Sequence, residues 1–270
     1  MKRIGLSLVR LAGLFALGAG TLSMPSSAGA AELRILVPDL PPMFFADGTG
    51  REANIITETL ASCGDTAVLT MVPFGRHWQD FTGGRGVDAV STVPLGMEMT
   101  GARSVPYIRY QNGAAVMKSS GLDIRSLDDL AERRVITFAG ASQVLPGLAE
   151  AAPRLADLRE RADQRVHSTM LFARRVDVVL ADGLILAEYN RQLEAQRLAG
   201  ERLSFDPRQE VAFTAIFPPT PYTLVFRDPA FRDRFDRCFG ELQAKGRIAE
   251  INRKAIEPYR ATVGDQYPAE

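Results

Sequence analysis

The sequence is poor in the residues from which catalytic and metal centres are most often built. Its 270 residues include only two cysteines and two histidines, His77 and His167. Neither histidine has a metal-ligating partner three or four positions away, and no CxxC, HExxH, P-loop or GxSxG motif is present. We therefore expect no catalytic residues, no metal site, no cofactor and no enzymatic activity.

The chain also lacks an excess of charge of either sign. Lys and Arg together number 32, as do Asp and Glu, and no block of like charges interrupts the sequence. Without a basic excess, little could offset a phosphate backbone, so we exclude nucleic acid as a partner. The composition, 46% hydrophobic and 24% charged, is that of a packed globular protein of one large or two small domains.

Long hydrophobic runs are missing except near the start. Three basic residues stand within the first ten positions, an apolar run covers residues 11–22, and small residues follow up to Ala30. This order is typical of a secretory signal peptide cleaved after Ala30 or Ala31, and the run is too short for the ~20 residues that span a bilayer. We expect residues 1–30 to be removed and the mature chain to be periplasmic, without direct membrane insertion.

The two cysteines, Cys63 and Cys238, leave two alternatives open. An exported chain meets an oxidising compartment, where they could form one disulfide bond. Two separate buried thiols fit the sequence equally well, because the spacing alone does not decide between them.

Strands and helices alternate along the mature chain. Strands are expected at residues 33–37, 68–74, 87–92, 134–138, 176–180 and 223–226, and helices at 54–62, 168–174 and 229–245. Such alternation predicts an α/β fold with mostly parallel sheets flanked by helices. The pattern restarts in the middle of the chain, and a proline-dense stretch at residues 217–222 suits a hinge or linker between two units.

Ligand-type groups gather where the predicted strands end. In open α/β sheets, ligands bind beyond the carboxyl ends of the strands. Four places qualify: residues 39–45, residues 92–98, Gly140 to Ser142, and Asp182. The backbone N–H groups at Gly140 to Ser142 could hold an anion, or Ser142 could be an ordinary helix N-cap. Asp182 could likewise be a turn or cap residue.

Several segments in order resemble the family 3 extracellular solute-binding proteins of ABC importers. They are residues 33–37 with Pro41-Pro42, 50–64 with Asn54 at the family's usual aspartate, 85–90, 126–142, 175–182 and the tail at 234–251. The resemblance implies a type II periplasmic binding protein fold: two lobes, each with a mostly parallel sheet flanked by helices, joined by hinge crossings near Met117 and Pro219. Lobe 1 would comprise residues 31–116 with 220–270, and lobe 2 residues 117–219.

The resemblance also implies a function and a site. A monomer of this family captures a small polar solute, an amino acid or amine, between its lobes for a membrane ABC permease. By position, Asp182 would pair with a ligand ammonium group, while Gly140 and Ser142 would donate to a carboxylate. Further cleft residues would be Asp39, Phe44, Phe74 and Thr92.

One departure from the family pattern concerns the carboxylate. The family's Thr-x-Glu-Arg motif, whose arginine binds that group, is replaced by Met97-Glu98-Met99-Thr100. Either Arg76 or Arg103 supplies the charge from a shifted position, or the ligand lacks the carboxylate. Two other functions stay open: a periplasmic dehydratase-like enzyme using Glu98 as acid or base, and an orphan sensor that presents its ligand to a membrane receptor.

Overall fold

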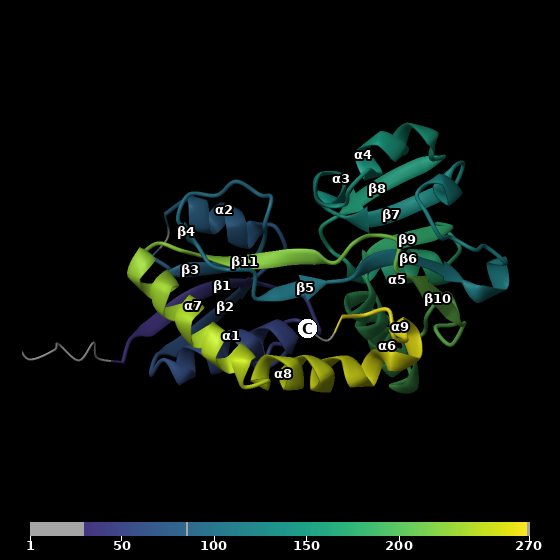
Figure 1. Ribbon diagram of the computed structural model, residues 1–270. Helices are drawn as coiled ribbons and strands as arrows, with labels where there is room; N and C mark the ends of the chain where they lie inside the picture. Colours follow the sequence, from purple (N-terminus) through teal and green to yellow (C-terminus); the bar gives the residue numbers. More distant parts are fainter. Residues whose placement is uncertain (1–29, 85, 269–270) are drawn as a thin grey trace, which may run out of the picture.

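The computed structural model describes residues 30–84 and 86–268, so the predicted signal peptide lies outside the described residues except for Ala30. Two sheets, each flanked by helices, form two lobes side by side (Figure 1). Within the described part of the chain, we find no helix with the length and apolar character that a membrane crossing requires. The predicted two-lobed α/β fold is confirmed.

Lobe 1 is built on a six-stranded mixed sheet in the order β2-β1-β3-β11-β4, with β5 also paired to β11. Its strands are β1 (Glu32–Pro38), β2 (Thr66–Val72), β3 (Ala89–Pro94), β4 (Ala102–Arg103), β5 (Ile108–Tyr110) and β11 (Thr220–Phe226). Strand β1 pairs in parallel with β2 and β3, whereas β11 runs antiparallel to β3. The helices of this lobe are α1 (Arg51–Ser62), α2 (Arg76–Thr82), α7 (Pro229–Ala244) and α8 (Arg247–Ile256).

Lobe 2 contains a five-stranded sheet in the order β10-β6-β9-β7-β8. Its strands are β6 (Asn112–Met117), β7 (Arg134–Phe138), β8 (Asp157–Arg161), β9 (Val178–Asp182) and β10 (Val211–Thr214). Its helices are α3 (Ala141–Val144), α4 (Leu148–Ala151), α5 (Arg165–Phe172) and α6 (Gly183–Leu198), with short 3-10 turns η1 (Lys118–Ser120), η2 (Asp128–Leu130) and η3 (Ala152–Arg154). The buried β7 and β9 pair in parallel, so their carboxyl ends meet at one edge.

The chain passes between the two sheets more than once. The first crossing is at Gln111, before the predicted position near Met117, because β6 already pairs with β9 from Asn112 onward. The second crossing lies between β10 and β11, next to Pro219. After α8, the turn η4 (Glu257–Tyr259) and helix α9 (Arg260–Val263) lead the chain against α6 and β10 of lobe 2, although residues 220–270 are predicted for lobe 1.

Helix α1 begins earlier than the sequence pattern predicts. Asn54 could cap a helix, but α1 starts at Arg51, preceded by Gly50. The N–H groups of Arg51 and Glu52 donate to the carbonyl oxygens of Pro42 and Met43, which satisfies the first turn without a side-chain cap. Gly50 has φ 135°, and a Cβ at this position would stand 2.3 Å from the Met43 carbonyl oxygen.

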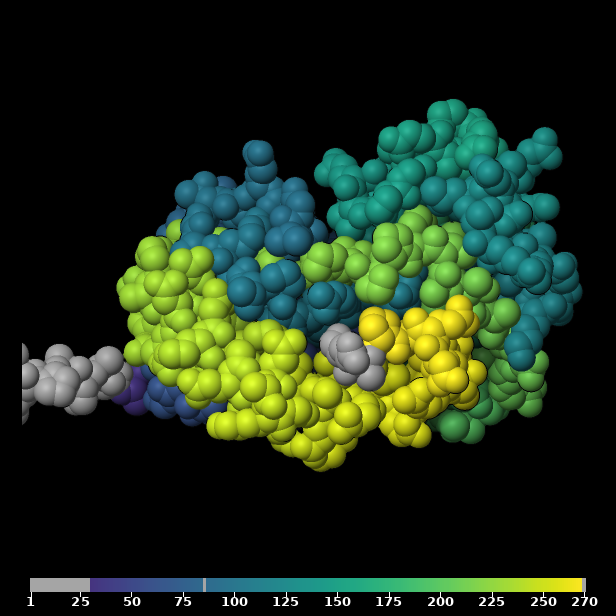
Figure 2. All heavy atoms as spheres, viewed as in Figure 1, coloured from purple at the N-terminus to yellow at the C-terminus, as the bar shows by residue number. Residues whose placement is uncertain are grey.

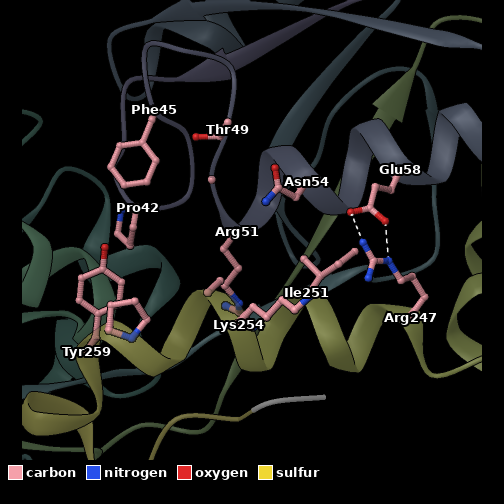
Figure 3. A pocket seen from close by; sticks show the side chains of 13 residues that line it. Pro42, Phe45, Thr49, Arg51, Asn54, Glu58, Arg247, Ile251, Lys254 and Tyr259 are labelled. Atoms are coloured by element: carbon pink, nitrogen blue, oxygen red, sulfur yellow. Dashed lines mark hydrogen bonds and ion pairs between the residues drawn. The ribbon is translucent and has the colours of Figure 1, made fainter.

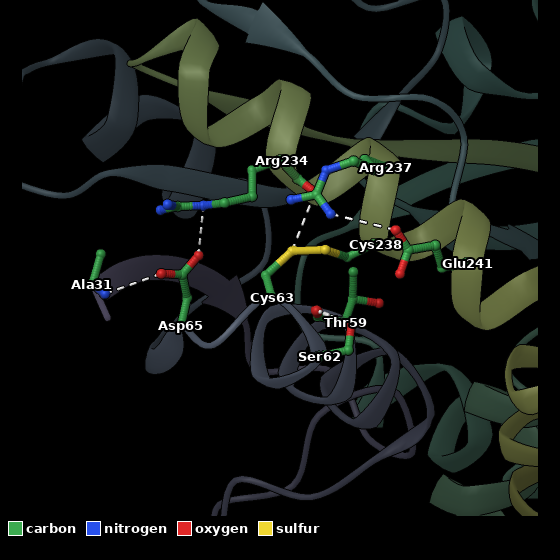
Figure 4. The surroundings of a disulfide bond; sticks show 9 residues. All are labelled: Ala31, Thr59, Ser62, Cys63, Asp65, Arg234, Arg237, Cys238 and Glu241. Carbon is green, nitrogen blue, oxygen red and sulfur yellow. Dashed lines mark hydrogen bonds and ion pairs between the residues drawn. A yellow bond between two sulfur atoms is a disulfide. The ribbon is translucent and has the colours of Figure 1, made fainter. Parts of the chain in front are cut away.

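A disulfide bond joins Cys63, at the end of α1, to Cys238 in the middle of α7 (Figure 4). Beside it, Arg234 Nε lies 2.8 Å from an Asp65 carboxylate oxygen, and the other oxygen of Asp65 accepts from the Ala31 N–H at 3.0 Å. The structure therefore favours the disulfide over two free thiols, and the bond fastens two helices of lobe 1 to each other.

Candidate functional site

A groove separates the two lobes on the face where α2 and α3 lie opposite each other (Figure 2). Between the lobes is a small cavity of about 10 Å³, which we call the interlobe pocket. Its lining residues come from both lobes: Leu40, Phe74, Tyr110, Asn112, Phe138, Gln164, Asp182, Ile185 and Tyr222. Phe138 and Asp182 are the last residues of β7 and β9, so the pocket lies at the carboxyl ends of the strands.

Aromatic side chains make contacts across this pocket. Phe74 of lobe 1 and Phe138 of lobe 2 meet edge to face, with ring centroids 6.3 Å apart. Trp78, the single tryptophan of the chain, packs edge-on against Phe74 at 5.2 Å. Tyr110 and Tyr222 lie 4.4 Å apart at the lobe junction. Of these rings, only Phe74 was predicted as a site residue. Phe138 was not, although the sequence pattern correctly predicts the strand that it ends, β7.

Asp182 lines the interlobe pocket and also has a structural role. One carboxylate oxygen accepts from the Leu184 and Ile185 N–H groups at 2.9 and 3.1 Å, which caps α6. The other oxygen accepts from the Gln111 N–H at 3.0 Å and the Tyr267 hydroxyl at 2.6 Å. Burial raises the pKa of Asp182 to about 6, although these hydrogen bonds oppose the rise.

Glu52 is a second buried carboxylate, which was not predicted as a site residue. It is fully buried in the first turn of α1, where it accepts hydrogen bonds from Thr92 Oγ1 at 2.9 Å and from the hydroxyls of Tyr107 and Tyr110. Burial raises its pKa. Thr92 itself has φ 55°, an uncommon conformation for a β-branched residue. Glu52, Ile55, Ile56 and Thr59 are spaced to lie on one face of a helix. This spacing could have indicated from the sequence that Glu52 points into the core.

A chain of hydrogen bonds connects the two lobes behind the pocket. Arg51 of α1 donates from Nε to Asn252 Oδ1 at 2.9 Å and from Nη1 to the Arg109 carbonyl oxygen at 2.9 Å. Nη1 also donates to the Tyr267 hydroxyl at 3.0 Å, and that hydroxyl donates to Asp182. The C-terminal segment therefore links a buried cation of lobe 1 to the carboxylate of lobe 2.

The donors at Gly140 and Ser142 already bind a carboxylate, which belongs to Glu160 of β8. The Gly140 N–H donates to Glu160 Oε2 at 2.8 Å, while the Ser142 N–H and hydroxyl donate to Oε1 at 2.9 and 2.6 Å. Partial burial would raise the pKa of Glu160, but the hydrogen bonds from Ser142 and Gly140 outweigh it and lower the pKa. An internal side chain thus occupies the donors that the sequence analysis assigned to a ligand.

The remaining predicted site residues lie elsewhere between or within the lobes. Asp39 and Phe44 line a different hollow, together with Arg165 and Tyr189 of lobe 2. Thr92 is fully buried beneath the pocket, where it contacts Glu52. Of the seven predicted residues, the structure brings Phe74 and Asp182 into the interlobe pocket; a ligand-binding role for any of them stays a prediction.

Neither arginine proposed to replace the missing family arginine lines the interlobe pocket. Arg103 directs Nη1 to the Pro94 carbonyl oxygen and Thr223 Oγ1, at 3.2 and 2.7 Å, and Nη2 to the Met97 carbonyl oxygen. Arg76 forms an exposed ion pair with Asp80 at 3.3 Å. Both guanidinium groups therefore have partners within lobe 1.

A larger pocket, of about 310 Å³, lies between α1 and α8 (Figure 3). Two hydrogen bonds of 2.6 and 2.9 Å join Arg247 to Glu58 across its wall, and Lys254 lines it next to Ile251. The predicted site residues do not line it. Most of its lining comes from lobe 1, and Pro258 and Tyr259 of the C-terminal segment complete it.

The two buried histidines make stability sensitive to acid. Burial lowers the pKa of His77 to about 3 and that of His167 to about 4. Because these values lie below the ordinary pKa of 6.5, the folded state loses stability as pH falls from about 6.5 toward 4, by about 1.4 kcal/mol per pH unit for each histidine. The raised pKa of Asp182 acts in the opposite direction below about pH 6.

We expect His77→Phe to weaken this pH dependence. Urea unfolding of the wild type and the variant at pH 7 and pH 4.5 measures the effect. The loss of unfolding free energy on acidification should be smaller in the variant, since phenylalanine takes up no proton. Equal losses in both proteins would show that folded His77 takes up its proton in this range as readily as in the unfolded chain, and that burial does not lower its pKa.

Comparison with known proteins finds relatives in structure but not in sequence. No protein-family model matches the chain, and no curated protein matches it significantly. Among solved structures, an ancestral arginine-binding protein bound to arginine is similar with a TM-score of 0.64 and 19% identity, over 83% of this chain and 97% of that one.

Two further solved structures are similar to this chain to the same degree. The amino-acid ABC transporter substrate-binding protein AbpA from Streptococcus pneumoniae, bound to L-arginine, has a TM-score of 0.65 and 17% identity, covering 84% of this chain and 94% of its own. EhuB in complex with hydroxyectoine has a TM-score of 0.62 and 23% identity, covering 88% and 89%. The chain therefore has the two-lobed fold of the ABC transporter substrate-binding proteins.

Proposed function

We propose that this protein is a periplasmic solute receptor that captures a small polar solute, an amino acid or an amine-like compound, and delivers it to a membrane ABC permease. The observation that carries this proposal is the interlobe pocket, to which both lobes contribute aromatic and polar side chains at the carboxyl ends of β7 and β9. The solutes named for the similar structures, arginine and hydroxyectoine, are small polar compounds of this kind.

Capture would proceed by a hinge motion at the crossings between the lobes. The side chains leave room in the interlobe pocket for about one water molecule. A solute must therefore separate Phe74 from Phe138 before it enters, and the two lobes then close on it. From lobe 2, the unpaired Oε1 of Gln164 would accept from a solute donor and the negative charge of Asp182 would attract a cationic group, while the rings cover the apolar surface of the solute.

The position of Glu98 supports a dehydratase-like enzyme less well than it supports a solute receptor. Glu98, the candidate acid or base, is exposed in the loop between β3 and β4 and does not line the interlobe pocket. We therefore infer a binding protein and not an enzyme. An orphan sensor would use the same pocket and closure; a membrane permease or a membrane receptor recovered with the ligand-loaded protein distinguishes the two.

A thermal stability screen tests the proposal. A solute that binds the native state raises the unfolding free energy by about 2.7 kcal/mol at one hundred times its dissociation constant. We expect the mature protein to melt at a higher temperature with at least one small amine or amino acid. The gain should be lost in Phe138→Ala and retained in Phe231→Ala, because Phe231 lies on α7, outside the pocket. A broad screen without any shift would refute capture of such solutes.

A further inference from the structure

The interlobe pocket offers a cation the negative charge of Asp182 and the unpaired Gln164 Oε1, but its lining has no cationic side chain for an anion. We propose that it selects small amines without a carboxylate group; this inference rests on the proposed function and names its substrate class. Among the described residues that line the pocket, none is Arg or Lys, and its one ionisable carboxyl group is Asp182. The carboxylates of ordinary amino acids would therefore enter without a cationic partner.

Gln164 adds a second acceptor to the pocket. Its side chain is 4% exposed, and its Oε1 atom has no hydrogen-bond partner. A buried carbonyl oxygen without a partner destabilises the folded protein, so a ligand N–H that reaches this oxygen would bind more tightly by satisfying it. Asn112, which also lines the pocket, already uses its amide nitrogen as a donor to Thr220 Oγ1 at 3.3 Å.

The donors beside the pocket are already occupied by an internal carboxylate. Gly140 and Ser142 follow Phe138 directly beyond the end of β7, and all three of their donor groups hold Glu160. A ligand carboxylate would have to displace Glu160 and would meet its negative charge. The donors of Arg103 are likewise directed to backbone carbonyl oxygens and Thr223.

The aromatic lining favours the same class of ligand. Phe74, Phe138, Tyr110 and Tyr222 all line the pocket. Aromatic faces carry partial negative charge, so they attract cations and repel anions. Asp182 adds a negative charge to this lining; the Tyr267 hydroxyl stands between its carboxylate and the Arg51 guanidinium, whose charge acts to lower the pKa of Asp182.

Matched pairs of probes that differ only in the α-carboxylate test the inference. We would titrate agmatine against arginine, cadaverine against lysine, and histamine against histidine, by calorimetry on the mature protein. The expected result is that at least one amine binds and that its amino acid binds at least ten times more weakly. An amino acid that binds as tightly as its amine, or more tightly, would overturn the inference while leaving solute capture intact. Failure of all six probes would overturn the inference, while solute capture is decided separately by the broad thermal stability screen.

A variant then tests the internal carboxylate. Glu160→Ala frees the donors at Gly140 and Ser142, so the preference for the amine over its amino acid should fall at least tenfold. The control is Glu150→Ala, an exposed glutamate of α4; this change should leave the preference as it is. Circular dichroism melting verifies that both variants fold. An unchanged preference in a folded Glu160→Ala protein would contradict the role of Glu160.

Discussion

Replacing Asp182 with alanine is expected to lower the free energy of unfolding by about 3 kcal/mol or more. The change removes the side-chain cap of α6, which is typically worth about 1 kcal/mol. It also leaves the Gln111 N–H and the Tyr267 hydroxyl buried without their acceptor, at about 1 to 3 kcal/mol for each unsatisfied group. Urea unfolding at pH 7.5, above the raised pKa of Asp182, measures the loss.

Asp228→Ala provides the matched control. Asp228 also caps a long helix, α7, but it is exposed and its side chain accepts from a single N–H, that of Ala230 at 2.8 Å. Its loss should cost about 1 kcal/mol. A cost for Asp182→Ala no greater than this would show that the contacts to Gln111 and Tyr267 contribute nothing to stability.

Removing the disulfide bond should lower the free energy of unfolding by about as much as Asp182→Ala does. Cys63 and Cys238 are 175 positions apart, and closing a loop of this length restricts the unfolded chain by about 5 kcal/mol, of which 2 to 5 kcal/mol is usually realised. We expect the Cys63→Ser, Cys238→Ser double variant to unfold at correspondingly lower urea concentration than the oxidised wild type.

Solute binding should survive this loss of stability. Both cysteines belong to helices of lobe 1, and neither lines the interlobe pocket. The double variant, assayed at a temperature where it is folded, should bind its solute with unchanged affinity. A stability loss below 1 kcal/mol would show that the unfolded chain gains little freedom without the bond.

The fold could be predicted from sequence because its signals are local. Strand β7 has the predicted bounds, Arg134–Phe138, since an apolar run ends at a glycine-containing turn. Asp228 followed by Pro229 begins α7 as their capping chemistry requires. The start of α1 was mispredicted because its N–H groups find partners in the distant loop at Pro42 and Met43.

The site was less accessible to prediction because its contacts are long-range. Asp182 was chosen from its position at a strand end, yet two of its partners, Gln111 and Tyr267, are 71 and 85 residues away. Glu160 reaches Gly140 and Ser142 because β8 pairs with β7, a register that the sequence pattern does not specify. Pairing across strands and lobes thus determines whether a donor is free for a ligand.

The central claim, that a solute binds by parting the two lobes, is tested most directly through Trp78. This single tryptophan packs against Phe74, which in turn contacts Phe138 of the other lobe. Titrating the stabilising solute while recording tryptophan emission should give a saturable change with one site per chain. A solute that stabilises the protein but leaves the emission of Trp78 unchanged at saturation would contradict binding between the lobes.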